Sequence, residues 1–89
     1  MPKYTALDVA RFMKVQLDKD GYIPQNWIVY EVIERFGESF TYTNDNGNPA
    51  FNRDVLAAFR RITPDVIWER GSQQWRKRES YDGKGRLAD

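Results

Sequence analysis

Val66-Ile-Trp-Glu-Arg-Gly-Ser-Gln-Gln-Trp-Arg-Lys-Arg78 is the stretch that decides the fold, because it reads as two strands joined by a turn. Gly71-Ser72 suits a two-residue type II′ turn, since glycine accepts the positive φ needed at the first central position. A four-residue loop from Arg70 to Gln73 gives the same strand register. In that register Trp68 and Trp75 lie directly opposite each other on one face, and aromatic cross-strand pairs of this kind stabilise a hairpin.

Length and composition indicate one small domain with little catalytic chemistry. The chain has 89 residues, 15% of them aromatic, so a small core can be filled with large side chains. It contains no cysteine and no histidine, and it therefore lacks disulfides, thiolate metal sites and the commonest general base. We expect no enzyme activity, no catalytic residue, no metal and no cofactor. No apolar run approaches the roughly 20 residues of a membrane span, and no signal-peptide segment is present, so we expect a cytoplasmic protein without a membrane partner.

The N-terminal part of the chain predicts a capped helix. Thr5 and Asp8 resemble a capping box, in which an acidic residue replaces the usual glutamate or glutamine. Apolar residues then recur at helical spacing, and a polar stretch ending at Gly21 closes the helix. Residues 22–24 are expected to form a turn, because Pro24 disfavours a helical conformation at the residue before it. The inward positions of this helix are Ala6, Val9, Ala10, Met13 and Leu17.

A second helix and a short strand are expected next. The helix begins at Pro24 or Gln25, with Asn26 as an alternative cap, and Gly37 lies where a C-cap glycine belongs. Phe40–Thr43 alternates aromatic and β-branched residues, which predicts a strand. The buried stripe of the helix comprises Val29, Val32, Ile33 and Phe36.

A turn, a third helix and the hairpin complete the domain. Asn44–Pro49 is a cluster of turn residues, Asn52 caps the third helix, and Thr63-Pro64-Asp65 ends it. Val55, Phe59 and Ile62 face inward. The order helix, helix, strand, helix, strand, turn, strand predicts an α+β fold. Residues 1–78 are expected to form one domain, and the polar, glycine-rich residues 79–89 a flexible tail.

This order of elements, with a polar third helix before a basic hairpin, resembles the winged helix-turn-helix superfamily over about residues 5–78. The chain is also similar to short uncharacterised bacterial proteins that form a family of unknown function. The residues that carry this second resemblance are Tyr4-Thr-Ala, Asp8-Val-Ala10, Asn46-Gly-Asn48, Val66…Trp68-Glu-Arg70 and Trp75-Arg-Lys-Arg-Glu79. The superfamily resemblance implies that the third helix enters the major groove of DNA and that the hairpin wing contacts an adjacent groove or phosphates. Many winged helices bind proteins instead.

The third helix carries a candidate DNA-binding face. The net charge is +1, but the first 52 residues carry −2 and the next 34 carry +4. Arg53, Ala57 and Arg60 share one helical face by their spacing, with Arg61 beside them. In one interpretation this face lies in a groove of double-stranded DNA, where arginines bond guanine edges or phosphates. In the other it is the solvated side of an amphipathic helix.

The hairpin supplies a second basic set. If Trp75 points to the core, Arg76 and Arg78 point to the other face, with Lys77 between them and Arg70 near the tip of the hairpin. These residues either contact phosphates or protect an edge strand against aggregation.

Trp27 and Tyr30 lie on the side of the second helix that faces away from its apolar stripe. They form either a surface for a protein partner or a second copy, or a patch covered by the tail or by the N-terminal segment including Tyr4. The leading hypothesis is a domain that binds double-stranded DNA through the third helix and the wing. The alternative is a protein-interaction module or homodimer.

Overall fold

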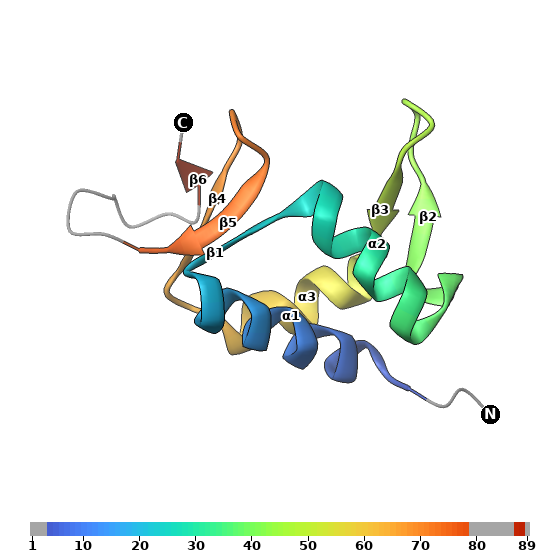
Figure 1. The fold of residues 1–89 in the computed structure, drawn as a ribbon, viewed down its shortest axis with the longest axis horizontal. Helices are drawn as coiled ribbons and strands as arrows, with labels where there is room; N and C mark the ends of the chain where they lie inside the picture. Colours follow the sequence, from blue (N-terminus) through green and yellow to red (C-terminus); the bar gives the residue numbers. More distant parts are fainter. Residues whose placement is uncertain (1–3, 79–86, 89) are drawn as a thin grey trace.

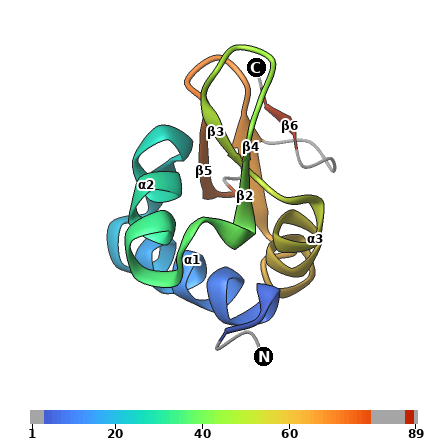
Figure 2. The same ribbon diagram turned by 90° about the vertical axis from the view of Figure 1, so that its right-hand side faces the viewer.

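The structure is a computed structural model that describes residues 4–78 and 87–88, and it is a small α+β domain. Figure 2 shows two of its helices on opposite sides of the molecule, the third beneath them, and two β-hairpins that reach away from that third helix. The helices are α1 (Ala6–Asp20), α2 (Gln25–Phe36) and α3 (Arg53–Ile62), as labelled in Figure 1. The expected fold class and number of helices are confirmed.

The main sheet joins distant parts of the chain. Its order is β1-β5-β4-β6, in which β1 and β4 pair antiparallel with β5, and β6 pairs parallel with β4. The bounds are β1 (Tyr22–Pro24), β4 (Val66–Glu69), β5 (Gln74–Lys77) and β6 (Leu87–Ala88). Of the expected tail, residues 79–86 and 89 lie outside the described residues, so its flexibility stays a prediction. Leu87 and Ala88 pair with Trp68 and Glu69.

The expectation of a turn at residues 22–24 is wrong, because these residues form strand β1. Ile23 pairs with Trp75, so the partner strand lies far along the chain and leaves no local signal. Pro24 disfavours helix at Ile23, but the extended conformation that it favours also suits a strand. A proline is tolerated here because β1 is at the edge of the sheet.

The register of the β4–β5 hairpin is confirmed. Trp68 lies opposite Trp75, with ring centroids 4.7 Å apart. The type II′ turn is wrong, however, because the last strand pair is Glu69 with Gln74 and the connection is the four-residue loop from Arg70 to Gln73. Gln73 takes the positive φ of this loop, at 50°, and Gly71 does not.

A second hairpin separates α2 from α3. It consists of β2 (Thr41–Thr43) and β3 (Pro49–Phe51), and the short 3₁₀ helix η1 (Glu38–Phe40) precedes it. The expected turn is confirmed: Asn44 Oδ1 accepts hydrogen bonds from the backbone N–H groups of Asn46 and Asn48, and Gly47 adopts a φ of 80°. The sequence does not predict strand β3, because its first residue, Pro49, belongs to the cluster of turn residues.

Both termini of α1 follow the sequence expectation. The Thr5 side chain accepts a hydrogen bond from the Asp8 N–H at 3.2 Å, and Asp8 Oδ2 accepts one from the Thr5 N–H at 2.8 Å. Gly21 ends the helix in the left-handed conformation, with a φ of 85°. The expectation that the Asn52 side chain caps α3 is wrong. The side chain donates to the Ser39 carbonyl at 2.8 Å and makes no capping bond.

Replacement of Thr5 by alanine should lower the free energy of unfolding by about 1 kcal/mol, because the first turn of α1 then loses its side-chain acceptor. Urea titration followed by circular dichroism measures the change. Thr5→Ser keeps the hydroxyl, so its free energy of unfolding should be close to that of the unchanged protein. Equal stability of the alanine and serine variants would contradict a stabilising cap.

The core lies between α1, α3 and the inner face of the main sheet. The helix α1 makes its most extensive contacts with α3, and α2 packs on β1 and β3. Most of the expected inward positions are buried, including Val9, Met13, Val55 and Phe59, and Ile28 is an additional core residue of α2. This packing turns the remaining side of α3 outward.

Candidate nucleic-acid interface

The outer side of α3 carries a shallow groove lined by arginines and small or apolar residues. Val55, Ala58 and Phe59 face the core, so the intervening positions face solvent. All five residues that line the groove are exposed: Arg53, Leu56, Ala57, Arg60 and Arg61. The structure therefore brings together the α3 residues that the helical spacing predicted.

The charge of this groove is not neutralised within the described part of the chain. Among residues 4–78 and 87–88, Arg53, Arg60 and Arg61 form no ion pair. Asp54, the acidic residue of the first turn, accepts a hydrogen bond from the Val55 N–H. The groove thus presents three guanidinium groups around a small side chain at Ala57. Groups of this kind can bind an anion through charge and hydrogen bonds.

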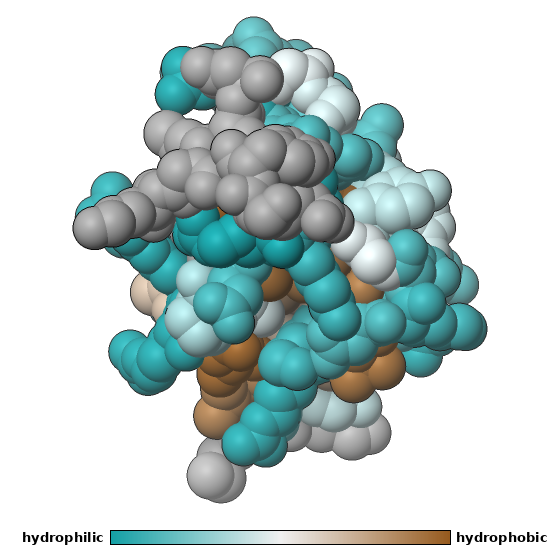
Figure 3. Space-filling view, turned by 90° about the vertical axis from the view of Figure 1, so that its left-hand side faces the viewer, coloured by the Kyte–Doolittle hydropathy of each residue, from teal (hydrophilic) through white to brown (hydrophobic). Residues whose placement is uncertain are grey.

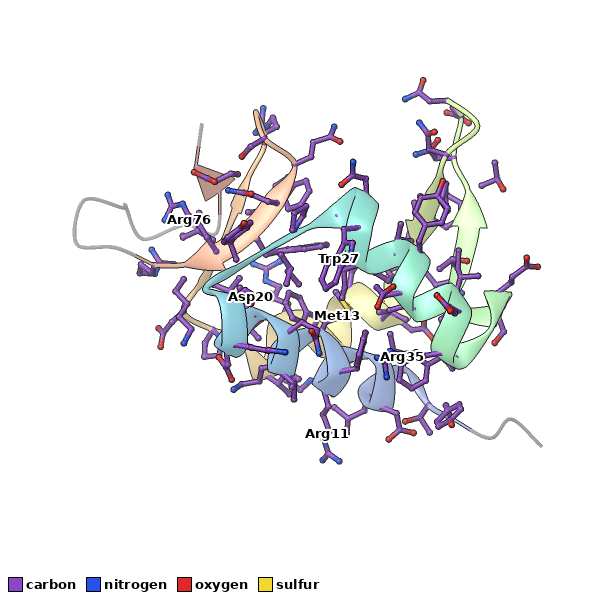
Figure 4. All side chains as sticks on the ribbon, viewed as in Figure 1. Arg11, Met13, Asp20, Trp27, Arg35 and Arg76 are labelled. Carbon is purple, nitrogen blue, oxygen red and sulfur yellow. The ribbon has the colours of Figure 1, made fainter. Side chains whose placement is uncertain are left out.

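Arg76 lies on the sheet face opposite Trp75, as the alternation predicted, but it is held in an ion pair. Its Nε is 2.9 Å from Oε2 of Glu69, and its side chain is only 14% exposed. Figure 4 shows Arg76 beside β5, in the sheet region. Glu69 and Arg76 are diagonal neighbours across the β4–β5 pair, and this position accounts for the contact.

The Glu69 carboxylate organises the outer end of this hairpin. It accepts hydrogen bonds from Gln74 Nε2 at 2.6 Å and from Ser72 Oγ at 3.2 Å, in addition to the Arg76 contact. The hydrogen bond from Gln74 is the main cause that holds the pKa of Glu69 below its ordinary value, and the Arg76 guanidinium is the next. The carboxylate therefore stays ionised in acid to a lower pH than a free glutamate.

The contribution of Glu69 to stability should disappear in acid. Because the pKa is lowered in the folded state, this contribution is complete above the pKa of the unfolded chain and is lost as the pH falls through the folded-state value. An NMR titration of the Gln74 side-chain amide should show a step at that lower pH. Glu69→Gln should remove the step, and a titration at the ordinary glutamate pKa would contradict the network.

Lys77 and Arg78 lie at the base of the hairpin rather than at its tip. Lys77 Nζ is 3.3 Å from Asp18 Oδ1, and Lys14 Nζ is 2.7 Å from Asp18 Oδ2. The hydrogen bond from Lys14 is the main cause of the lowered pKa of Asp18. The Arg78 N–H donates to the Asp65 carbonyl at 2.8 Å.

These base residues line a cleft between α1 and the connection from α3 to β4, with Leu17, Ile62 and Val66 as apolar wall. Figure 3 shows this end of the molecule, where hydrophilic side chains dominate and apolar ones are visible between them. The wing cations are thus dispersed. Arg70 is exposed in the tip loop, Arg76 and Lys77 are in ion pairs, and the three α3 arginines share one exposed helix face.

Trp27 and Tyr30 are exposed, at 41% and 58% of their surface. Tyr4 does not cover them, because its ring packs edge-on against Phe36 with centroids 4.8 Å apart. The interpretation in which Tyr4 covers the pair is therefore wrong. The alternative, in which the tail covers Trp27 and Tyr30, depends mainly on residues 79–86 and 89, which lie outside the described ranges.

Within residues 4–78 and 87–88, no three histidine, cysteine, aspartate or glutamate side chains form a group that could hold a metal ion. In the same part of the chain, no helix has both the length and the apolar character needed to cross a bilayer.

The fold and the α3 groove define a small α+β domain with a basic helix face. The chain belongs to a family of unknown function (DUF6953), whose model matches residues 5–77. Comparison with curated proteins gave no match, and neither did comparison with solved structures. The family match agrees with the resemblance to an uncharacterised family, and it covers all three helices and both hairpins.

Proposed function

We propose that this chain is a winged-helix-like domain that binds double-stranded DNA, with α3 in the major groove. The observation that carries the proposal is the groove of Arg53, Arg60 and Arg61, which have no ion pair in the described residues. Phosphate neutralisation by arginine and lysine supplies most of the affinity of such complexes. Three guanidinium groups on one exposed helix face, unpaired among the described residues, meet this requirement.

The topology supports the proposal. A strand between the first two helices pairs with the C-terminal hairpin in the order β1-β5-β4, so the proposed wing is anchored in a sheet beside the helices. One feature departs from a helix-turn-helix, whose turn has about 3–4 residues. Here residues 37–52, with η1 and the β2–β3 hairpin, separate α2 from α3. The proposed interface therefore centres on α3, with the exposed Arg70 of the β4–β5 loop as the wing residue nearest to an adjacent phosphate position.

The dimensions of α3 fit this role. A helix with its side chains is about 10–12 Å across and the major groove is about 12 Å wide, so the ten residues of α3 can lie in the groove. Ala57 permits close approach between the arginines. In the proposed complex Arg53, at the start of the helix, contacts base edges, while Arg60 and Arg61 in the last turn contact phosphates.

Fluorescence anisotropy with a labelled generic duplex tests the proposal. With three to four phosphates neutralised, the affinity should fall by roughly 40- to 150-fold between about 50 and 200 mM salt. Sequence-independent binding with this salt dependence is the expected result. Absence of binding at the lower salt concentration, or an affinity that does not change with salt, would contradict it.

A homodimer through α2 is the second candidate function. The exposure of Trp27 and Tyr30 favours it, because clustered exposed aromatic side chains often anchor interfaces. Sedimentation across a range of protein concentrations measures the oligomeric state. A dimer that Trp27→Ala dissociates would support this function, and a monomer at all concentrations would exclude it.

A further inference from the structure

A second cleft lies between the two hairpins, beside the first turn of α2. Figures 1 and 2 show both hairpins reaching to the same side of the molecule, and α2 on the side opposite α3. The cleft has a volume of about 360 Å³. Cavities of about 300–1,000 Å³ are typical of small-molecule sites.

The lining of this cleft is polar but uncharged. None of the ten described residues that line it is an aspartate, glutamate, lysine or arginine. Carboxamides offer a donor and an acceptor side by side, so the cleft presents a dense set of neutral hydrogen-bonding groups. The six carboxamide residues in the lining are Gln25, Asn26, Asn44, Asn46, Asn48 and Gln73.

The walls of the cleft are tied together. The Gln25 N–H at the start of α2 donates to the Gln73 carbonyl in the β4–β5 loop at 3.0 Å. On the other wall, Asn44 Oδ1 accepts two backbone N–H groups of its own loop and so fixes the loop conformation. The carboxamide residues therefore lie on braced segments. The Asn44 oxygen is occupied by its own loop, and the bracing lowers the entropy cost of ordering the other carboxamides around a ligand.

Two aromatic rings complete the lining. Tyr30 is 58% exposed, so its ring is accessible to a ligand. Trp68 is half-buried, and its ring packs against Trp75 with centroids 4.7 Å apart. A flat ring bound here would find aromatic surface for stacking and amide groups for its edge.

We propose that this cleft binds a nucleobase, supplied as a purine nucleoside. Asparagine and glutamine match the adjacent donor and acceptor of adenine, and aromatic side chains stack on bases. A phosphate would need cations, and none of the described residues that line the cleft is cationic. This site shares no lining residue with the α3 groove, so the proposal does not depend on DNA binding by α3.

An NMR titration of the full chain with adenosine tests the site, and a separate titration with ribose is the control for binding through the sugar. Adenosine should give saturable shifts in the side-chain amides of Asn26, Asn46 and Gln73, whereas ribose should give none. Equal shifts with ribose would show recognition of a sugar and overturn the proposal. Absence of shifts with adenosine at tens of millimolar would also overturn it.

Two tyrosines provide a matched pair of variants. Tyr30 lines the cleft, and Tyr42 is 54% exposed but does not line it. Tyr30→Ala should weaken adenosine binding at least about fivefold, the loss expected for one stacking ring, and Tyr30→Phe should retain most of the affinity. Tyr42→Ala should leave it unchanged. Equal effects of the two alanine variants, both with native amide spectra, would contradict a stacking role for Tyr30.

Discussion

Replacement of Trp75 by alanine should lower the free energy of unfolding by about 3–5 kcal/mol, which is a large part of the stability of a domain this small. Trp75 lies in the central region of the main sheet and is 5% exposed. Its ring packs edge-on against Phe59 at 5.4 Å and beside Phe51 at 6.2 Å. Its removal leaves a cavity between the sheet and α3 that the remaining side chains cannot fill.

The three tryptophans of the chain allow a graded control by urea titration. Trp68 is partly buried against the core, so Trp68→Ala should cost less than Trp75→Ala. Trp27 is 41% exposed, and Trp27→Ala should change the stability least. A Trp75→Ala variant that unfolds at the same urea concentration as Trp27→Ala would show that Trp75 does not hold the core together.

Loss of all three α3 arginines should have the largest effect on DNA binding. Each arginine that neutralises a phosphate contributes about 0.9 to the slope of log affinity against log salt. The combined variant Arg53→Ala, Arg60→Ala, Arg61→Ala should therefore lose close to three units of slope and most of its affinity at low salt. Anisotropy titrations at several salt concentrations measure both quantities.

Arg11 provides the matched control for these variants. It is an exposed arginine of α1, and Figure 4 shows it pointing away from the molecule on the side below α1. Arg11→Ala removes the same charge from a different surface, so it should leave the slope nearly unchanged. An equal loss of affinity in the Arg11 variant and in a single α3 variant would indicate a response to net charge alone and would contradict an α3 interface.

Features encoded by neighbouring residues could be predicted from the sequence. Thr5 and Asp8 are three residues apart, and both bonds of their capping box are present. The pairing of Trp68 with Trp75 follows from a short hairpin in which either loop length gives one register. The arginines of α3 share a face because helical periodicity separates them from Val55 and Phe59.

Features that depend on distant segments could not be predicted in this way. Strand β1 forms because Ile23 meets Trp75, and nothing near Ile23 indicates that partner. The cleft between the hairpins is assembled from α2, the β2–β3 loop and the β4–β5 loop, so its carboxamides are scattered in sequence. The Glu69–Arg76 ion pair is an intermediate case, because the predicted register already made these residues diagonal neighbours.

Amide chemical-shift mapping with a generic duplex at low salt tests the central proposal most directly. DNA binding through α3 predicts shifts concentrated at Arg53, Ala57, Arg60 and Arg61, with a smaller effect at Arg70 and none around Arg11. Shifts centred on Trp27 and Tyr30 that grow with protein concentration would indicate self-association instead. That result, or the absence of any shift on α3, would contradict the proposed interface.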